Sequence, residues 1–286
     1  MTRIERQGSM NVQKIAAFSD GNTGGNPAGV VISEHHPSDE EMKRIAAEVG
    51  FSETAFAAPI KDAFRVRYFS PESEVPFCGH ATIALGAALA LKQGDGIFNL
   101  VLNEAEITVE GHQHNGVISA ALQSPPTHSA KVSPPLVSDT LALFGYTHDD
   151  LDLKIPPARM NGGADHLVLA LKTREALSAM KYDLAAGREL MNREELVTIT
   201  LVYAETPQRF HTRNPFASGG VYEDPATGAA TAAFAGYLRD IEWPHNGVID
   251  IVQGEDMGMR SLLKAEIPPE RGSSIRISGT ARIMES

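Results

Sequence analysis

The sequence predicts an α+β fold of two similar domains, each a curled, mostly antiparallel sheet around one central helix. The first observation behind this prediction is an internal repeat, in which residues 74–84 return in altered form at residues 223–233. The offset of 149 positions pairs Glu74 with Glu223, Gly79 with Gly228 and Thr82 with Thr231. The second observation is that each half is rich in strand patterns and has one long Ala-rich segment, which favours a sheet wrapped around a helix. No G-x-G-x-x-G motif opens a βαβ unit, so a dinucleotide site is not expected.

Local patterns place the elements of the first half. Ser38, followed by Glu41 three residues later, is typical of a helix start, and Gly50 ends that helix. Gly79 begins a second helix that is expected to run to about Leu91. The segment 19–27 is too rich in Gly and Asn for a core element and predicts a turn. Apolar or alternating runs predict strands at 14–18, 28–32, 52–59, 64–69, 99–102 and 117–122.

The second half repeats this order. Helices are expected at 138–143, at 188–193 and from Gly228, and strands at 166–171, 197–203, 208–213, 247–253, 262–267 and 274–284. The segment 123–135 contains four prolines and predicts the crossing between the halves. The expected N-terminal domain therefore spans 10–128 and is completed by the C-terminal strand 274–286, while the C-terminal domain spans 129–273.

Composition narrows the functional classes. A formal net charge of −11, without any cluster of Lys and Arg, argues against a nucleic-acid or anionic-membrane partner. The chain of 286 residues has a single Cys, which excludes an internal disulfide, and no apolar run approaches the roughly 20 residues that span a bilayer. Residues 1–9 are polar and Met10 is a candidate start, so no signal peptide is expected. A reduced, cytoplasmic setting is the default expectation.

The two repeated segments are candidates for binding a small organic acid. Each carries acidic or nucleophilic side chains into the start of a helix, where free N–H groups and the positive dipole end favour a carboxylate. A cleft between two such helix starts would hold a small-molecule carboxylate.

Glu53 and His80 are candidates for proton transfer. Glu53 lies between small polar neighbours and close to Phe51 and Phe56, and burial of a carboxyl raises its pKa toward the range useful for acid–base catalysis. An exposed strand carboxylate is the alternative. His80 follows Gly79 at a helix start, where the dipole favours a neutral ring. A capping or packing role is its alternative.

Asp224 and Cys78 are the remaining candidates from the repeated segments. Asp224 is placed to cap the helix at Gly228 or to reach into the cleft, and Thr227 is an alternative cap. Cys78 precedes Gly79, where a helix start lowers a thiol pKa, although burial as a small apolar residue is the commoner fate of a lone Cys.

No metal site is expected, because the other histidines lack ligand spacing. His112 and His114 are assigned to a turn, whereas His166 and His211 are assigned to strands with sheet or core roles. A G-x-S-x-G motif is missing, which argues against a serine hydrolase.

The motifs together resemble the phenazine-biosynthesis (PhzF-like) isomerase family, a branch of the diaminopimelate-epimerase-like fold. The matching segments extend over nearly the whole chain: Gly25-Asn26-Pro27-Ala28-Gly29, Gly50-Phe51-Ser52-Glu53-Thr54, Arg67-Tyr68-Phe69-Ser70-Pro71, Cys78-Gly79-His80-Ala81-Thr82, Glu223-Asp224-Pro225-Ala226-Thr227-Gly228 and Gln253-Gly254. Their order and spacing are specific, although each segment alone is weak.

The resemblance implies two similar domains, an active site in the cleft between them, no cofactor and a homodimer. It implies that Glu53 is the general base and acid, and that His80 and Asp224 position and polarise the substrate. Backbone N–H groups at Gly79–His80 and Gly228–Ala229 would hold the substrate carboxylate. The remaining substrate contacts expected from the matching segments are Asn26, Ser52 and Cys78.

Departures from the family pattern bear on specificity. Ala229 stands where the phenazine-pathway enzyme has Ser, so one hydroxyl contact is absent. A second Cys is missing from residues 225–227, which excludes a two-thiol racemase. Arg260 is displaced by one position from the family's cation, which leaves its orientation open. A Cys78-assisted epimerase and a non-catalytic binder of an anionic metabolite are the alternatives to the isomerase.

Overall fold

The computed structural model describes residues 10–285. The elements of the first half are β1 (Gln13–Ala17), β2 (Asn26–Ile32), α1 (Asp39–Val49), β3 (Thr54–Ile60), β4 (Ala63–Phe69), β5 (Glu74–Val75), α2 (Gly79–Gln93), β6 (Gly96–Val101), β7 (Glu106–His114) and β8 (Val117–Gln123). The predicted caps of α1 are confirmed, since the Ser38 side chain accepts from the Glu41 N–H and Gly50 ends the helix in the left-handed conformation.

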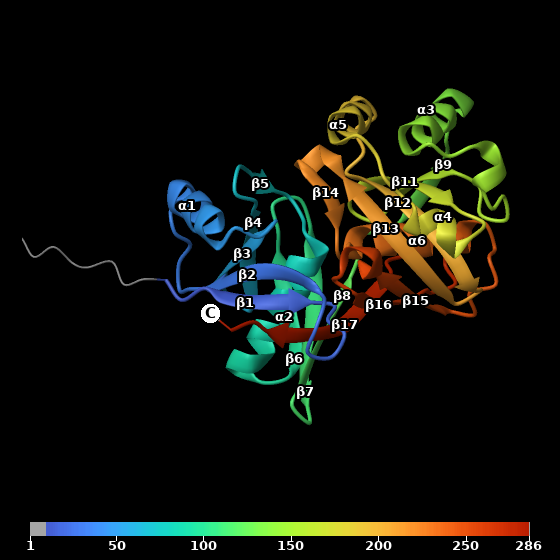
Figure 1. Cartoon of the computed structure of the whole chain (residues 1–286). Helices are drawn as coiled ribbons and strands as arrows, with labels where there is room; N and C mark the ends of the chain where they lie inside the picture. Colours follow the sequence, from blue (N-terminus) through green and yellow to red (C-terminus); the bar gives the residue numbers. More distant parts are fainter. Residues whose placement is uncertain (1–9, 286) are drawn as a thin grey trace, which may run out of the picture.

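The second half begins with a strand inside the proline-rich crossing. Its elements are β9 (His128–Lys131), α3 (Pro134–Phe144), η1 (His148–Asp150), β10 (Ala158–Asn161), β11 (Asp165–Ala170), α4 (Arg174–Ser178), α5 (Leu184–Arg193), β12 (Thr198–Thr206), β13 (Arg209–Phe216), η2 (Ala217–Gly219), β14 (Val221–Asp224), α6 (Gly228–Asp240), β15 (Val248–Gln253), η3 (Glu255–Met257), β16 (Ser261–Glu266) and β17 (Arg276–Ile283). Figure 1 shows these elements beside those of the first half.

Strand pairing repeats from one half to the other. In the first half β2 pairs in parallel with β3 and β4 with β6, and in the second half β11 pairs in parallel with β12 and β13 with β15. The other pairings between named strands of residues 10–285 are antiparallel. The chain therefore has a mixed, sheet-dominated α+β fold, as predicted.

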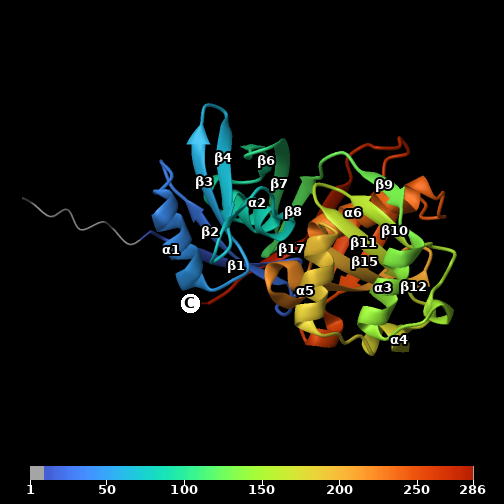
Figure 2. The same cartoon turned by 90° about the horizontal axis from the view of Figure 1, so that it is seen from above.

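One set of strands closes around α2. Strands β1, β2, β3, β4, β6, β7, β8 and β17 pair in turn, and β17 returns to β1. Helix α2 packs inside this set and is buried from Gly79 to Ala90, because its Ala-rich surface is apolar on every side. Figures 1 and 2 show α2 surrounded by these strands and α6 surrounded by strands of the second half. Strand β17 also pairs with β16, which links the two groups.

Some local assignments from sequence were wrong. His112 and His114 lie on β7 rather than in a turn, because β7 continues to a tight hairpin at Asn115 and Gly116, both with positive φ. Strands β9 and β10 were not predicted, since both are short and half polar; they pair with each other. The division into domains at residue 128 stays a prediction. No helix within residues 10–285 combines the length and apolarity needed to cross a membrane.

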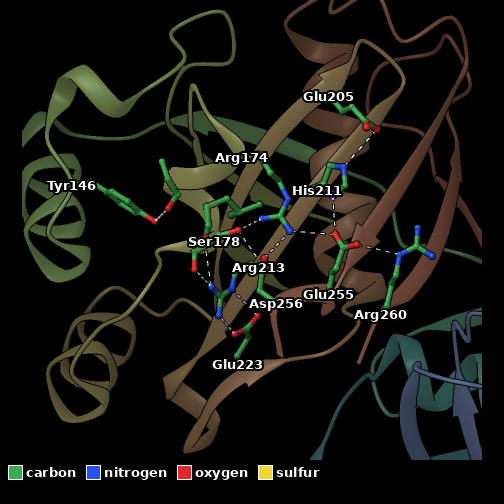
Figure 3. A network of polar contacts seen from close by, with 12 residues as sticks. Tyr146, Arg174, Ser178, Glu205, His211, Arg213, Glu223, Glu255, Asp256 and Arg260 are labelled. Carbon is green, nitrogen blue, oxygen red and sulfur yellow. Dashed lines mark hydrogen bonds and ion pairs between the residues drawn. The ribbon is translucent and has the colours of Figure 1, made fainter. Parts of the chain in front are cut away.

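The two glutamates matched by the repeat make the same contact. Glu74 of β5 accepts two hydrogen bonds from Arg67 of β4, at 2.8 and 2.6 Å. Glu223 of β14 accepts two from Arg213 of β13, at 3.1 and 2.6 Å, as Figure 3 shows. Each two-point ion pair holds the strand that leads into α2 or α6. The internal repeat is therefore present in side-chain contacts as well as in strand order.

Burial distinguishes these two ion pairs and predicts unequal stability effects. The side chains of Arg213 and Glu223 are 8% and 3% exposed, against 18% and 25% for Arg67 and Glu74. Glu223→Gln leaves a buried guanidinium without its charged partner and is expected to lower the free energy of unfolding by about 3 kcal/mol. Glu74→Gln is the matched control and is expected to cost about 1 kcal/mol. Urea denaturation of both variants checks this, and equal losses would contradict it.

Candidate active site

The starts of α2 and α6 lie against each other. A Cβ built on Gly79 would lie 3.2 Å from the backbone N of Ala229 and 3.2 Å from the Cα of Gly228. A larger residue at Gly79 would therefore push the two helices apart. The N-cap residues, Cys78 and Thr227, make no side-chain capping bond. Both positive helix ends thus point to one region, as expected from sequence, whereas the side-chain cap of α6 considered for Asp224 or Thr227 is not formed.

Glu53 lies directly before β3, beside the start of α2. Its backbone carbonyl accepts from the Gly29 N–H at 3.3 Å, which fixes it against β2. The residue is 8% exposed, and its Oε2 has no hydrogen-bond partner within residues 10–285. This oxygen lies 3.5 Å from Nε2 of His80. A buried carboxylate oxygen without a partner is costly, so this oxygen is a candidate acceptor for a hydrogen bond from a ligand or a water.

His80 connects Glu53 with two neighbouring side chains. It is the second residue of α2 and is 4% exposed. Its Nε2 lies 3.4 Å from the Ser52 hydroxyl, and its Nδ1 lies 3.3 Å from the Cys78 sulfur. The ring is therefore held from both nitrogens and orients the groups around Glu53.

Asp224 closes the other side of the site, at the end of β14. Its Oδ1 accepts from the Asn26 amide at 2.8 Å, and its Oδ2 accepts from the Thr227 hydroxyl at 2.5 Å. The carboxyl thus does not cap α6, and Thr227 bonds it instead of capping. Burial raises the pKa of Asp224 to about 6, although the nearby His80 ring opposes this shift.

Asn26 joins the two halves at this point. It is the first residue of β2 and is buried, and its amide donates to the Ala226 carbonyl at 2.8 Å as well as to Asp224. The Gln253 side chain supports the same loop, because its amide donates to the Asp224 carbonyl and its Oε1 accepts from the Thr227 N–H. The loop before α6 is therefore fixed by residues from β2 and β15.

Cys78 is buried, and burial raises its thiol pKa well above the ordinary value; the Glu53 carboxylate adds to this effect. The expected lowering by the helix start is thus overridden by desolvation. Glu53, Cys78 and His80 each have one ligand atom within 4.8 Å of the other two, so the three side chains are close enough together to hold a metal ion. Sequence spacing did not reveal it. A thiol that resists ionisation does not favour such binding.

A cleft of about 740 Å³ opens beside these residues. Of the residues predicted to contact substrate, Asn26, Ser52, Glu53 and Asp224 line it. The other five are not among the lining residues and lie at the starts of α2 and α6: Cys78, Gly79, His80, Gly228 and Ala229. Lining residues that the sequence did not single out come from the loop after β4, from α5, from the position before β12 and from the segment before β14; they include Glu72, Arg188, Val197, Phe216 and Ser218.

Arg260 does not line this cleft. Its guanidinium lies 2.5 Å from Asp20 and 3.5 Å from Glu255. Figure 3 shows Arg260 facing Glu255, at the edge of the network that includes Arg174 and Asp256. The displaced cation therefore joins a surface ion-pair network.

A family model described as phenazine biosynthesis-like protein matches residues 15–286. The chain belongs to this family. It is 32% identical over 274 residues to trans-2,3-dihydro-3-hydroxyanthranilate isomerase of Pseudomonas aeruginosa, covering 93% of this chain and 94% of the relative. It is 30% identical over 283 residues to an uncharacterized isomerase of Mesorhizobium japonicum, covering 92% and 93%. Both relatives are named isomerases, and the present family member is an isomerase.

Solved structures agree with the fold. The Bacillus anthracis phenazine biosynthesis protein of the PhzF family superposes with a TM-score of 0.85 at 22% identity, covering 96% of this chain and 97% of that one. A probable proline racemase from Agrobacterium radiobacter superposes with a TM-score of 0.66 at 10% identity, covering 96% and 91%. The fold is thus shared with racemases as well as with the PhzF family.

The raised pKa of Asp224 predicts a pH dependence of stability. Because the pKa rises from 3.8 to about 6 on folding, the protonated form is favoured in the folded state. This contribution is fully present below pH 4 and is lost as the pH rises through 6, by about 3 kcal/mol in total. Asp224→Asn is expected to remove this part of the slope. Urea denaturation of both proteins between pH 4 and pH 7 checks it, and parallel curves would contradict it.

Proposed function

We propose that this isomerase moves a proton between carbons of a small carboxylic acid, without a cofactor, and that Glu53 takes and returns the proton. The observation that carries the proposal is that Glu53 lines the cleft and that its buried Oε2 has no hydrogen-bond partner within the described chain. A general base needs a free lone pair within reach of its substrate.

The adjoining helix starts supply the complementary charge. When a proton leaves the carbon next to a carboxylate, negative charge builds up on the carboxylate oxygens. The N–H groups at the starts of α2 and α6 are fixed before the reaction and would stabilise that charge. The contact between Gly79 and Gly228 supports this role, because it brings both helix ends to one place.

The reaction is balanced without an oxidant or reductant. The C–H bond breaks, the proton passes to the Glu53 carboxylate, and the electron pair enters the unsaturated system of the substrate. Glu53 then returns the proton to another carbon, which gives an isomer. We propose that His80 positions Glu53, because Nε2 of His80 lies 3.5 Å from Oε2 of Glu53.

Asp224 would polarise the substrate in this scheme. With a pKa of about 6, its carboxyl is protonated in a fraction of molecules at neutral pH and is then able to donate a hydrogen bond. The Asn26 amide already donates a hydrogen bond to one oxygen of the Asp224 carboxyl, and the Thr227 hydroxyl donates to the other. These two bonds fix the orientation of the carboxyl toward a substrate. We include the two-domain division and a homodimer in the proposal, on the family resemblance.

A Cys78-assisted epimerase is the second candidate. The 3.3 Å contact between the Cys78 sulfur and His80 Nδ1 favours it, since a His beside a thiol is the usual means of forming a thiolate. The raised thiol pKa of Cys78 weighs against it. A binder without catalysis is a third candidate, which binding of an acid without proton exchange would identify.

Glu53→Gln is expected to slow solvent-deuterium incorporation into substrate by about a thousandfold, because the amide accepts no proton at neutral pH. The first acid to test is trans-2,3-dihydro-3-hydroxyanthranilate, for which a 32% identical relative is named. If this acid is not a substrate, a panel of unsaturated carboxylic acids replaces it. Proton NMR in deuterated buffer measures the exchange.

Cys78→Ser is the matched control, because Cys78 contacts His80 from the other ring nitrogen. We expect it to retain most of the exchange. Loss of exchange in Cys78→Ser with retention in Glu53→Gln would assign the proton transfer to the thiol. Exchange that persists in both variants would refute both assignments.

A further inference from the structure

Arg188 is a cation of the cleft without an ionic partner. It is an exposed residue of α5, and none of the hydrogen bonds or ion pairs within residues 10–285 involves its side chain. Every other arginine in this part of the chain makes at least one such contact. Its guanidinium, with five donors, is therefore available to a ligand.

The packing of α5 directs this side chain to the cleft. Helix α5 lies on the turn η2, and a Cβ built on Gly187 would lie 3.3 Å from the Ala217 Cβ. This close approach places the next residue, Arg188, beside the segment after η2. Its Nη1 lies 4.0 Å from a Cβ built on Gly220, and both Arg188 and Gly219 line the cleft.

The charge balance of the cleft points to an anionic ligand at Arg188. The lining includes three carboxylates, those of Glu53, Glu72 and Asp224, and Arg188 is the one Lys or Arg among the lining residues. Glu53 and Asp224 are 8% and 6% exposed, whereas Arg188 is exposed. The two acids thus lie in the buried part of the lining and Arg188 in its exposed part.

We infer that Arg188 binds a second anionic group of the substrate, so that the isomerase acts on dicarboxylic acids. This inference rests on the proposed function, in which the first carboxylate lies at the helix starts. A planar guanidinium binds a carboxylate through two parallel hydrogen bonds and favours it over a neutral group. The cleft of about 740 Å³ is lined by Arg188 and by Asp224 and Pro225 of the loop that leads into α6, so it extends from Arg188 toward the helix starts.

Calorimetric titration of the full chain tests the inference with pairs of acids: succinate and butyrate, glutarate and valerate, adipate and hexanoate. For at least one pair, the diacid is expected to bind about tenfold more tightly than the monoacid, which corresponds to one charge-assisted contact. Arg188→Gln should remove this preference. The preference should also shrink as salt is added, since Arg188 is exposed.

Arg193→Gln is the matched control. Arg193 lies on the same helix but pairs with Asp139 and Glu194, outside the cleft, so the preference should persist in this variant. Glu72→Gln tests a second explanation of the diacid preference, in which Arg188 pairs with Glu72 and closes the cleft instead of binding the ligand. Removing a like charge from the lining should increase the preference for diacids, whereas a loss equal to that of Arg188→Gln would overturn the inference.

Two further results would also overturn it: no diacid preference in the unmodified protein, or a preference that survives in Arg188→Gln. The Glu53→Gln protein separates this question from the proposed function, because it should still bind diacids more tightly than monoacids without exchanging protons. A diacid preference together with undiminished exchange in Glu53→Gln would refute the proton-transfer role alone. Impaired exchange in Glu53→Gln without a diacid preference would refute the role of Arg188 alone.

Discussion

The contact between the first residues of α2 and α6 is the constraint on which the site depends. Gly79 and Gly228 are close enough that a Cβ on Gly79 would lie 3.2 Å from the Ala229 N. Two helix ends of the same polarity repel each other, so this arrangement is unfavourable unless negative charge lies nearby. Glu53 and Asp224 are buried acidic side chains near this contact, and an anionic substrate would add to their effect. Helix geometry and the acidity of the site are thus two parts of one electrostatic arrangement.

The repeat explains how one chain makes two such helix starts in the right place. Each half directs a strand toward its central helix through an Arg–Glu ion pair, Arg67–Glu74 or Arg213–Glu223. The two halves carry different polar side chains at their helix starts, with Cys78 and His80 in the first half and Asp224 and Thr227 in the second. A duplicated scaffold therefore places different side chains on opposite sides of one position, as the proposed proton transfer requires.

Much of this was predictable from the sequence because the relevant residues are local signals. Gly79 and Gly228 mark the helix starts, and Ser38 and Gly50 mark both ends of α1. The unpredicted parts depend on contacts between distant segments. Strand β10 has no strong pattern and is stabilised by pairing with β9 and β11. The hydrogen bonds of Asn26 to Asp224 and Ala226 span about 200 positions, and no local signal reports them.

Desolvation accounts for the clearest difference between the expected and observed chemistry of the site. A helix start stabilises a thiolate less than bulk water does, so burial of Cys78 costs the thiolate more than the helix start returns. Burial and the nearby Glu53 carboxylate therefore raise the thiol pKa of Cys78. The same burial moves the Asp224 pKa up to about 6. Both shifts favour the neutral forms, so the Cys78 thiol is uncharged at neutral pH and the Asp224 carboxyl is protonated in a fraction of molecules. The neutral thiol therefore adds no negative charge beside Glu53 and Asp224, the acidic side chains that offset the two positive helix ends, and under the proposed function Arg188 would attract an anionic substrate to the same cleft.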